Sequence, residues 1–272
     1  MQWQALPQVQ RMPDRQQLLA NIIENDVIPR LLLANRNELA IAPPATCLTA
    51  AKLRERVDEF SELVINSDAQ ASIAYFEALQ QQGASIESMF QDLLAPTARR
   101  LGELWDEDIN DFLDVTRGIG HLQQIVRTFS DEFSNEIRRP LASKRALLMP
   151  LPDEQHTFGI SLLREHFLRE GWRVWSGPPQ SMDDIVKLVK GQYFEMVGLS
   201  ASALKNAGQL AEHIRLIRKA SINRDLHIFV GGYAFNDKPD LVASVGADAT
   251  AADGREALLH VKTLIEVRKS AG

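Results

Sequence analysis

The chain has 272 residues, of which 45% are hydrophobic and 24% are charged, and its formal net charge is -6. This composition supports a buried core and excludes wholesale disorder, and the acidic balance disfavours a protein that works by neutralising nucleic-acid phosphates or anionic lipid. The single cysteine, Cys47, cannot form an internal disulfide, which fits a reducing compartment, so we expect a cytoplasmic protein. We expect neither a membrane span nor a signal peptide, because no run is apolar enough and the first residues lack the required layout.

The first half of the chain has helical periodicity, with apolar residues recurring at three- and four-residue steps. The last predicted helix carries an apolar stripe from Phe112 to Phe133, and Pro96 predicts a kink or a break in the preceding predicted helix. Gly118 and Gly120 each cost about 1 kcal/mol in a helix, which suggests the close approach of a neighbouring helix or of a macrocycle. The periodicity therefore predicts a helical bundle, with helices at 15–35, 49–66, 69–82, 86–105 and 112–133.

After a basic linker at 137–144, short apolar runs alternate with helical windows. The runs are 146–149, 173–175, 196–199, 227–230 and a weak 247–251, and the helical windows are 159–170, 182–191, 207–220, 237–245 and 254–269. This alternation predicts an α/β domain with a flavodoxin-like (Rossmann-type), five-stranded parallel sheet in the order 2-1-3-4-5. The predicted organisation is an N-terminal extension with a first helix at 1–47, a helical bundle at 48–139 and the α/β domain at 140–272.

The loops after the first, third and fourth strands are the candidate sites, because ligands of open parallel sheets bind beyond the carboxyl ends of the strands. The first loop contains His156, with Asp153 and Glu154 near enough in sequence to accept its second ring proton. An imidazole held in this way is a good metal ligand, and the alternative is an ordinary exposed loop histidine.

Small residues populate the same three loops. Gly159 either begins a helix or lets a ligand come close, and Gly231-Gly232 forms either a tight turn or, with the hydroxyls of Ser200 and Ser202, one side of a slot. Signatures of phosphate loops, dinucleotide binding, serine hydrolases and zinc sites are absent, so the sequence predicts no enzyme of these classes.

Taken together, these loops resemble those of cobalamin-binding domains, which carry Asp-x-His-x-x-Gly, then Ser-x-Leu, then Gly-Gly at similar spacing. The corresponding segments here are Glu154-Gln-His156-Thr-Phe-Gly159, Ser200-Ala-Ser202 and Gly231-Gly232. The chain departs from the pattern twice, with Glu154 in place of Asp and Ser202 in place of Leu. With the preceding helices, which resemble the helical cap of such proteins, the resemblance spans about residues 50–268.

The resemblance implies that His156 is the lower axial ligand of cobalt and that Glu154 hydrogen-bonds the far nitrogen of its ring. It also implies that Gly159, Ser200, Gly231 and Gly232 accept the displaced nucleotide tail of the cofactor. The remaining residues of the implied cofactor site are Thr157, Phe158, Ser202, Tyr233, Trp105 and Val115.

The helical region bears on the subfamily. In light-sensing repressors of this family a cap tryptophan is followed, after nine residues, by Glu-His. In this chain Trp105 is followed, after nine residues, by Val115-Thr116. The stretch 104–123 is instead similar to the AerR and PpaA antirepressors of photosynthesis genes in purple bacteria, and to the related sensor domain that contains heme. Alternatively, Trp105 is a core aromatic, and His121 is better explained by solvent or helix packing than by metal binding.

This similarity implies a non-enzymatic cobalamin-dependent light or redox sensor, a photoreceptor that binds a transcriptional repressor and does not bind DNA directly. One alternative is a corrinoid carrier protein of a methyltransferase system. Heme or a linear tetrapyrrole on the same fold, and a protein that has lost its ligand, are the others. The oligomeric state, including a homodimer, is left open by the sequence.

Overall fold

The computed structural model describes residues 48–135, 144–152, 154–179, 181–204, 206–236 and 238–271. Within the chain, residues 48–272 form one compact unit. The predictions for residues 1–47, for the linker at 136–143 and for Asp153 lie outside the described residues.

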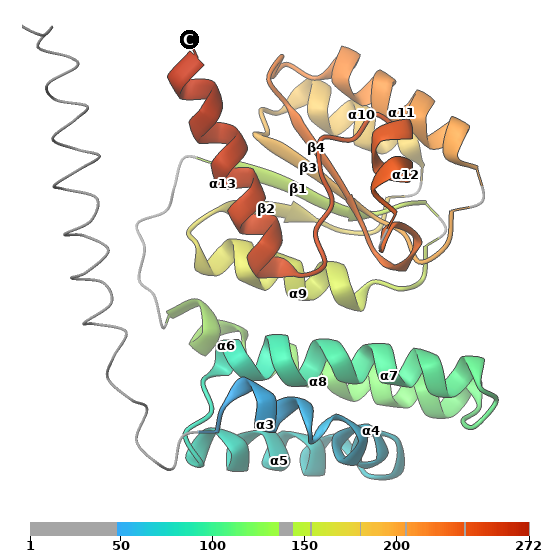
Figure 1. Ribbon diagram of the computed structural model, residues 1–272, viewed down its shortest axis with the longest axis vertical. Helices are drawn as coiled ribbons and strands as arrows, with labels where there is room; N and C mark the ends of the chain where they lie inside the picture. The colour runs from blue at the N-terminus through green and yellow to red at the C-terminus, as the bar shows by residue number, and fades with distance from the viewer. Residues whose placement is uncertain are drawn as a thin grey trace, which may run out of the picture. The chain divides into compact units, whose positions relative to one another are not determined.

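Helices occupy the described chain up to residue 135, as predicted. Asp68 begins one of them as an N-cap, its Oδ1 accepting a hydrogen bond from the backbone N–H of Ala71 at 2.8 Å. In chain order these elements are α3 (Ala50–Arg54), α4 (Val57–Asn66), α5 (Ala69–Gln81), α6 (Ile86–Met89), the π-helix η2 (Phe90–Leu94), α7 (Ala95–Asp106) and α8 (Phe112–Asn135) (Figure 1).

Two of the predicted helices differ in detail from the structure. The helix predicted at 49–66 is divided, because Arg56 donates its N–H to Leu53 in a tighter turn before α4 begins. The kink predicted at Pro96 is instead a widened π turn, in which Ala95 donates its N–H to Phe90. Proline cannot donate to the carbonyl four residues earlier and collides with it, so widening the preceding turn lets the helix continue.

The core of the bundle is aromatic. Phe76 lies 4.7 Å from Phe129, and Phe90 lies 4.7 Å from Phe133, measured between ring centroids. The predicted close helix approach is confirmed at Gly118, where an added Cβ would lie 2.9 Å from Cδ1 of Leu101 on α7.

Gly120 differs from Gly118, because an added Cβ there meets nothing within 4 Å. The expectation of a neighbouring helix is therefore wrong at Gly120.

A parallel sheet forms the second part of the compact unit. Its strands are β1 (Arg145–Pro150), β2 (Arg173–Ser176), β3 (Met196–Ser200) and β4 (His227–Gly231), in the order β2-β1-β3-β4. The connecting helices are α9 (Phe158–Arg169), α10 (Met182–Gly191), α11 (Ala207–Ala220), α12 (Pro239–Ser244) and α13 (Gly254–Ala271). The predicted fold, a helical region followed by a Rossmann-like parallel sheet, is confirmed.

The fifth strand predicted at 247–251 is reduced to one bridge, between Phe229 and Ala249, so the sheet of the described residues has four strands. Asp248 explains the difference. Its Oδ2 accepts the N–H of Ile228 at 2.6 Å and its own N–H donates to the carbonyl of Ile228 at 2.8 Å. A side chain thus occupies a backbone donor of β4 that another strand would need for a longer ladder.

Successive residues of β1 face opposite helical layers, as the two-residue period of a strand requires. Leu147 and Met149 lie in the cluster formed with α10, α11 and α12, whereas Ala146 and Leu148 lie in the cluster formed with α9 and α13. Figure 1 shows these helices on the two faces of the sheet.

Helix α9 also contacts the bundle. Phe158 and Leu162 of α9 belong to the apolar cluster of the bundle, and the ring of Phe133 meets that of His166 at 5.2 Å between centroids. In the parts of the chain that the structure describes, no helix combines the length and apolar character needed to cross a membrane.

Candidate functional site

The three candidate loops begin at the same edge of the sheet. In the observed register Pro150 at the end of β1 pairs with Ser200 of β3, and Ser200 pairs with Gly231 of β4. The chain leaves β1 towards β2 on one side and passes from β3 to β4 on the other, so the boundary between β1 and β3 is the point where strand order reverses. Open parallel sheets bind ligands at this point.

His156 is held by Glu154 on the loop after β1. The Nδ1 atom of the ring lies 2.7 Å from Oε1 of Glu154, and the same oxygen accepts the backbone N–H of His156 at 2.8 Å. The expected hydrogen bond between the two side chains is therefore present. Because an ionised carboxylate only accepts, it selects the form of the neutral ring with its proton on Nδ1 and leaves Nε2 with a free lone pair.

The two side chains of this pair differ in exposure. The His156 side chain is 65% exposed, and the Glu154 side chain is 8% exposed. The ring is thus on the surface, as in the alternative of a loop histidine. Its orientation is nevertheless fixed by the buried carboxylate of Glu154. The role of His156 as a metal ligand stays a prediction.

Ser202, on the loop after β3, completes the surroundings of Glu154. Its backbone N–H donates to Oε2 of Glu154 at 2.6 Å, and its hydroxyl lies 2.8 Å from Oε2 and 3.0 Å from Oε1. Burial by itself raises the pKa of Glu154, but the hydrogen bonds from Ser202 and His156 outweigh it and lower the pKa below its ordinary value. Glu154 is therefore anionic at neutral pH.

The glycines of the loops have different surroundings. At Gly159 an added Cβ would meet nothing within 4 Å, so the space beside the first turn of α9 is open. Gly232 has φ of +92°, and an added Cβ there would collide with the backbone carbonyl of Ala201. The close approach of the protein's own backbone thus accounts for glycine at this position, and the contribution of Gly231 and Gly232 to a slot for the nucleotide tail stays a prediction.

The other predicted residues of these loops are divided between surface and core. Thr157 is the residue before α9 and makes no side-chain capping hydrogen bond, and Ser200 is half-buried. Phe158 is buried in the apolar cluster of the bundle, so its ring serves packing. Tyr233, in contrast, is 76% exposed beside Gly232.

On the bundle, Trp105 is exposed, which is contrary to the alternative of a core aromatic. Its ring meets that of Phe112 edge-on at 6.5 Å between centroids. Phe112 was predicted on the buried stripe of α8 but is exposed, because it begins the helix where the core ends. Val115 is half-buried against the bundle core, and His121 bonds the carbonyl of Val64 through Nδ1 at 2.8 Å, which is helix packing as expected.

The turn between α7 and α8 carries four exposed apolar side chains that were not predicted, those of Trp105, Ile109, Phe112 and Leu113. A signal was present in the sequence, since acidic residues alternate with these apolar residues from Asp106 to Asp114. The alternation of charge indicates a solvated turn, not the start of a buried stripe.

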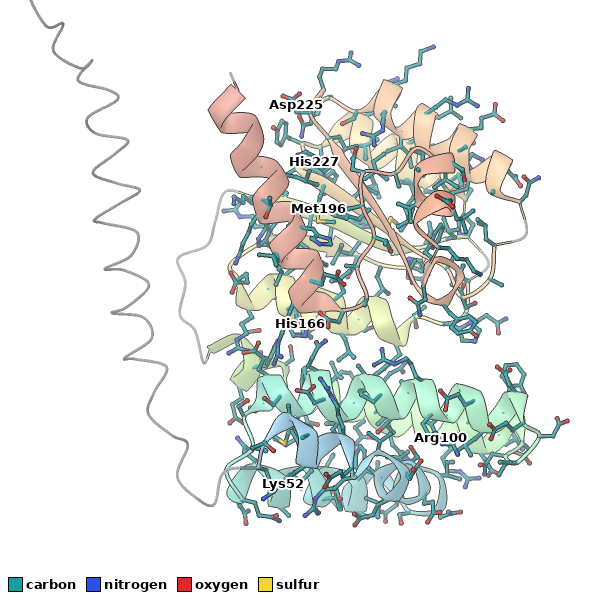
Figure 2. All side chains as sticks on the ribbon, viewed as in Figure 1. Lys52, Arg100, His166, Met196, Asp225 and His227 are labelled. Carbon is teal, nitrogen blue, oxygen red and sulfur yellow. The ribbon has the colours of Figure 1, made fainter. Side chains whose placement is uncertain are left out.

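A charged contact between the bundle and the sheet domain was not predicted either. Glu87 of α6 accepts two guanidinium groups at 2.8 Å each, from Arg169 of α9 and Arg255 of α13. Burial raises the pKa of Glu87, but the two arginines outweigh it and lower the pKa. His166, which is labelled in Figure 2, is buried against Gly254. Burial lowers its pKa to about 4.

Among the described residues, no group of three or more His, Cys, Asp or Glu side chains is placed to hold a metal ion. His156 therefore stands as a single imidazole with one free nitrogen, and Glu154 is fully engaged with His156 and Ser202.

Comparison with known proteins finds a match for the sheet domain. Residues 144–262 match the family model of the B12 binding domain. The chain is 21% identical, over 178 residues, to an uncharacterized 20.5 kDa protein in the bchF-crtJ intergenic region of Rhodobacter capsulatus, with 65% of this chain and 92% of that protein covered.

The fold is similar to that of the monomethylamine corrinoid protein of Methanosarcina barkeri. The TM-score is 0.65 at 14% sequence identity, and the match covers 79% of this chain and 99% of that one. The chain thus combines a helical region with a sheet domain that matches the B12 binding domain in sequence and a corrinoid protein in fold.

Proposed function

We propose that the chain binds cobalamin at the carboxyl edge of the sheet and acts as a non-enzymatic light or redox sensor that binds a transcriptional repressor. The observation that carries the proposal is the His156–Glu154 pair. It places a ring with a free Nε2 on the loop after β1, within the residues that match the B12 binding domain.

The residues present fit such a cofactor. A metal held by one imidazole has to bring its other ligands with it, which a tetrapyrrole does. Glu154 orients the ring and raises the basicity of Nε2, and the open space at Gly159 admits a group beside the first turn of α9. When bound, cobalamin would supply an absorbing corrin ring and a cobalt ion whose ligand bonds respond to light and to reduction.

The sensor role rests on the stretch from Trp105 to Thr116, which resembles that of antirepressors and lacks the Glu-His of DNA-binding regulators. The rings of Trp105 and Phe112 in this stretch are exposed, so a partner that binds there would cover them. A net charge of -6 favours a protein partner over DNA. A ligand changes partner binding only through its different affinity for two arrangements of the chain.

A corrinoid carrier of a methyltransferase system is the second candidate, and the fold similarity to the monomethylamine corrinoid protein favours it. Methyl transfer from a supplied donor and partner enzyme would support the carrier. Association with a repressor that changes on illumination or reduction would support the sensor. Heme and linear tetrapyrroles are distinguished from cobalamin by the absorption spectrum of the loaded protein.

The test is the uptake of hydroxocobalamin by the purified full-length chain, followed by absorption after removal of free cofactor. We expect binding at one cofactor per chain with a spectral change, and loss of both in His156→Ala. His213→Ala, on α11, is the matched control and should bind as the wild type does. Absence of uptake by the wild-type chain would refute the proposal.

A further inference from the structure

The carboxylate of Glu154 bridges two loops that are 48 residues apart in sequence. The backbone donors of the two loops reach different oxygens, and the hydroxyl of Ser202 lies within hydrogen-bond distance of both. Oε1 accepts from the backbone and the ring of His156 at 2.8 and 2.7 Å, whereas Oε2 accepts from the backbone N–H and the hydroxyl of Ser202 at 2.6 and 2.8 Å. The carboxylate therefore cannot rotate without breaking contacts on one side or the other.

The contacts of Ser202 restrict Glu154 more than His156 alone can. Glu154 and His156 are two residues apart on one loop, so their contact by itself leaves the loop free to move as a unit. Ser202 belongs to the loop after β3, and the β1–β3 pairing of Pro150 with Ser200 fixes where that loop begins. Through Ser202, the orientation of the ring is therefore fixed relative to the sheet and not only relative to its own loop.

The same two residues are the two departures from the cobalamin-binding pattern noted above. Glutamate is one methylene longer than aspartate, and serine supplies a hydroxyl where leucine has none. The structure shows that these departures touch each other, because the longer carboxylate reaches the hydroxyl that the second departure provides. A change at either position alone would remove the contact between hydroxyl and carboxylate, while the backbone N–H of residue 202 stays a donor.

We infer that Ser202 is a positioning residue for His156, acting through Glu154, and that Glu154 and Ser202 form a compensating pair. This inference rests on the proposed function only for what His156 binds. The hydrogen-bonded arrangement itself belongs to the protein without cofactor, so it can be tested separately.

The first test is the tautomer of His156 in the cofactor-free protein, read from long-range ¹H–¹⁵N NMR at a pH where the ring is neutral. We expect the Nδ1–H form to prevail in the wild type and its fraction to fall in Ser202→Ala towards that of free histidine, in which the Nε2–H form prevails. Ser202→Thr, which keeps the hydroxyl, should restore it. Ser244→Ala, which removes a hydroxyl on α12, is the control and should change nothing.

The second test is a cycle that returns the pair to the pattern, with Glu154→Asp, Ser202→Leu and the double variant. Each single variant should weaken hydroxocobalamin binding about 10-fold, and the double variant should bind more tightly than the two losses combined would allow. Additive losses, or an unchanged tautomer in Ser202→Ala, would overturn the inference. A tautomer that shifts as expected in a chain that takes up no cobalamin would refute the proposed function and leave the inference standing.

Discussion

At the scale of single residues, the orientation of His156 depends on contacts from two loops. Glu154 holds the ring from the loop after β1, and Ser202 holds Glu154 from the loop after β3.

Gly159 of α9 and Gly232 should respond in opposite ways to the same substitution. Gly232→Ala should lower the free energy of unfolding by about 3 kcal/mol, because alanine is strained at φ of +92° and its Cβ collides with Ala201. Gly159→Ala should not lower it, because the space around this helical position is open, but it should weaken cobalamin binding. Urea unfolding and cofactor titration measure the two effects, and equal stability of the two variants would contradict this reading.

Of the contacts at this site, the one between Glu154 and His156 was predictable, because two residues separated by one position on a loop can reach each other. The contact with Ser202 was not, since it depends on the register of β1 and β3, which no local pattern specifies. The exposure of Trp105 was not predictable either, because aromatic periodicity does not show where a core ends.

At the scale of elements, helix and strand positions followed from periodicity and capping, as with the Asp68 cap of α5. The failures have identifiable causes. A π turn ahead of Pro96 keeps the helix intact where a break was expected, and the carboxylate of Asp248 takes a backbone donor that a full fifth strand would use. In both cases a backbone group has a different hydrogen-bond partner from the one expected, and composition and periodicity do not predict such partners.

Helix α8 offers a matched pair of substitutions. Gly120→Ala should raise the free energy of unfolding by about 1 kcal/mol, because its surroundings are open and alanine favours the helix. In Gly118→Ala the new Cβ crowds Leu101 at 2.9 Å, so this variant should be at least about 1 kcal/mol less stable than Gly120→Ala. Thermal and urea unfolding give the difference, and the reverse ranking would show that α7 and α8 do not approach closely at Gly118.

At the scale of the whole molecule, the bundle and the sheet domain are joined by apolar packing and by charge. Phe158 and Leu162 enter the bundle cluster, and Glu87 accepts arginines from α9 and α13. These residues come from distant parts of the sequence, and only the tertiary fold brings them together.

The contact between the bundle and the sheet domain predicts that the stability of the protein depends on pH. The pKa of His166 is lowered from 6.5 to about 4 by burial, with Glu87 and Asp253 opposing the shift and Arg255 and Arg169 adding to it. Below pH 6.5 the unfolded chain gains a proton that the folded protein takes up only near pH 4. As the pH falls from 6.5 to about 4, His166 alone should therefore lower the free energy of unfolding by about 1.4 kcal/mol per pH unit.

At more acidic pH, Glu87 should lower the free energy of unfolding further. Its pKa is lowered in the folded state, so its contribution to stability disappears as the carboxylate takes up a proton. Urea unfolding at a series of pH values should show a shallower slope for His166→Gln than for the wild type between pH 6.5 and about 4. Identical slopes would mean that the ring is not buried as a neutral group.

The most direct measurement of the central claim is electron paramagnetic resonance of the protein loaded with cobalamin in its cobalt(II) state. If Nε2 of His156 is the axial ligand, the nitrogen splitting should change from a triplet to a doublet when the protein carries ¹⁵N-histidine, and the doublet should vanish in His156→Ala. A triplet that persists with labelled histidine would show that a nitrogen other than one from histidine binds the metal, and would contradict the account.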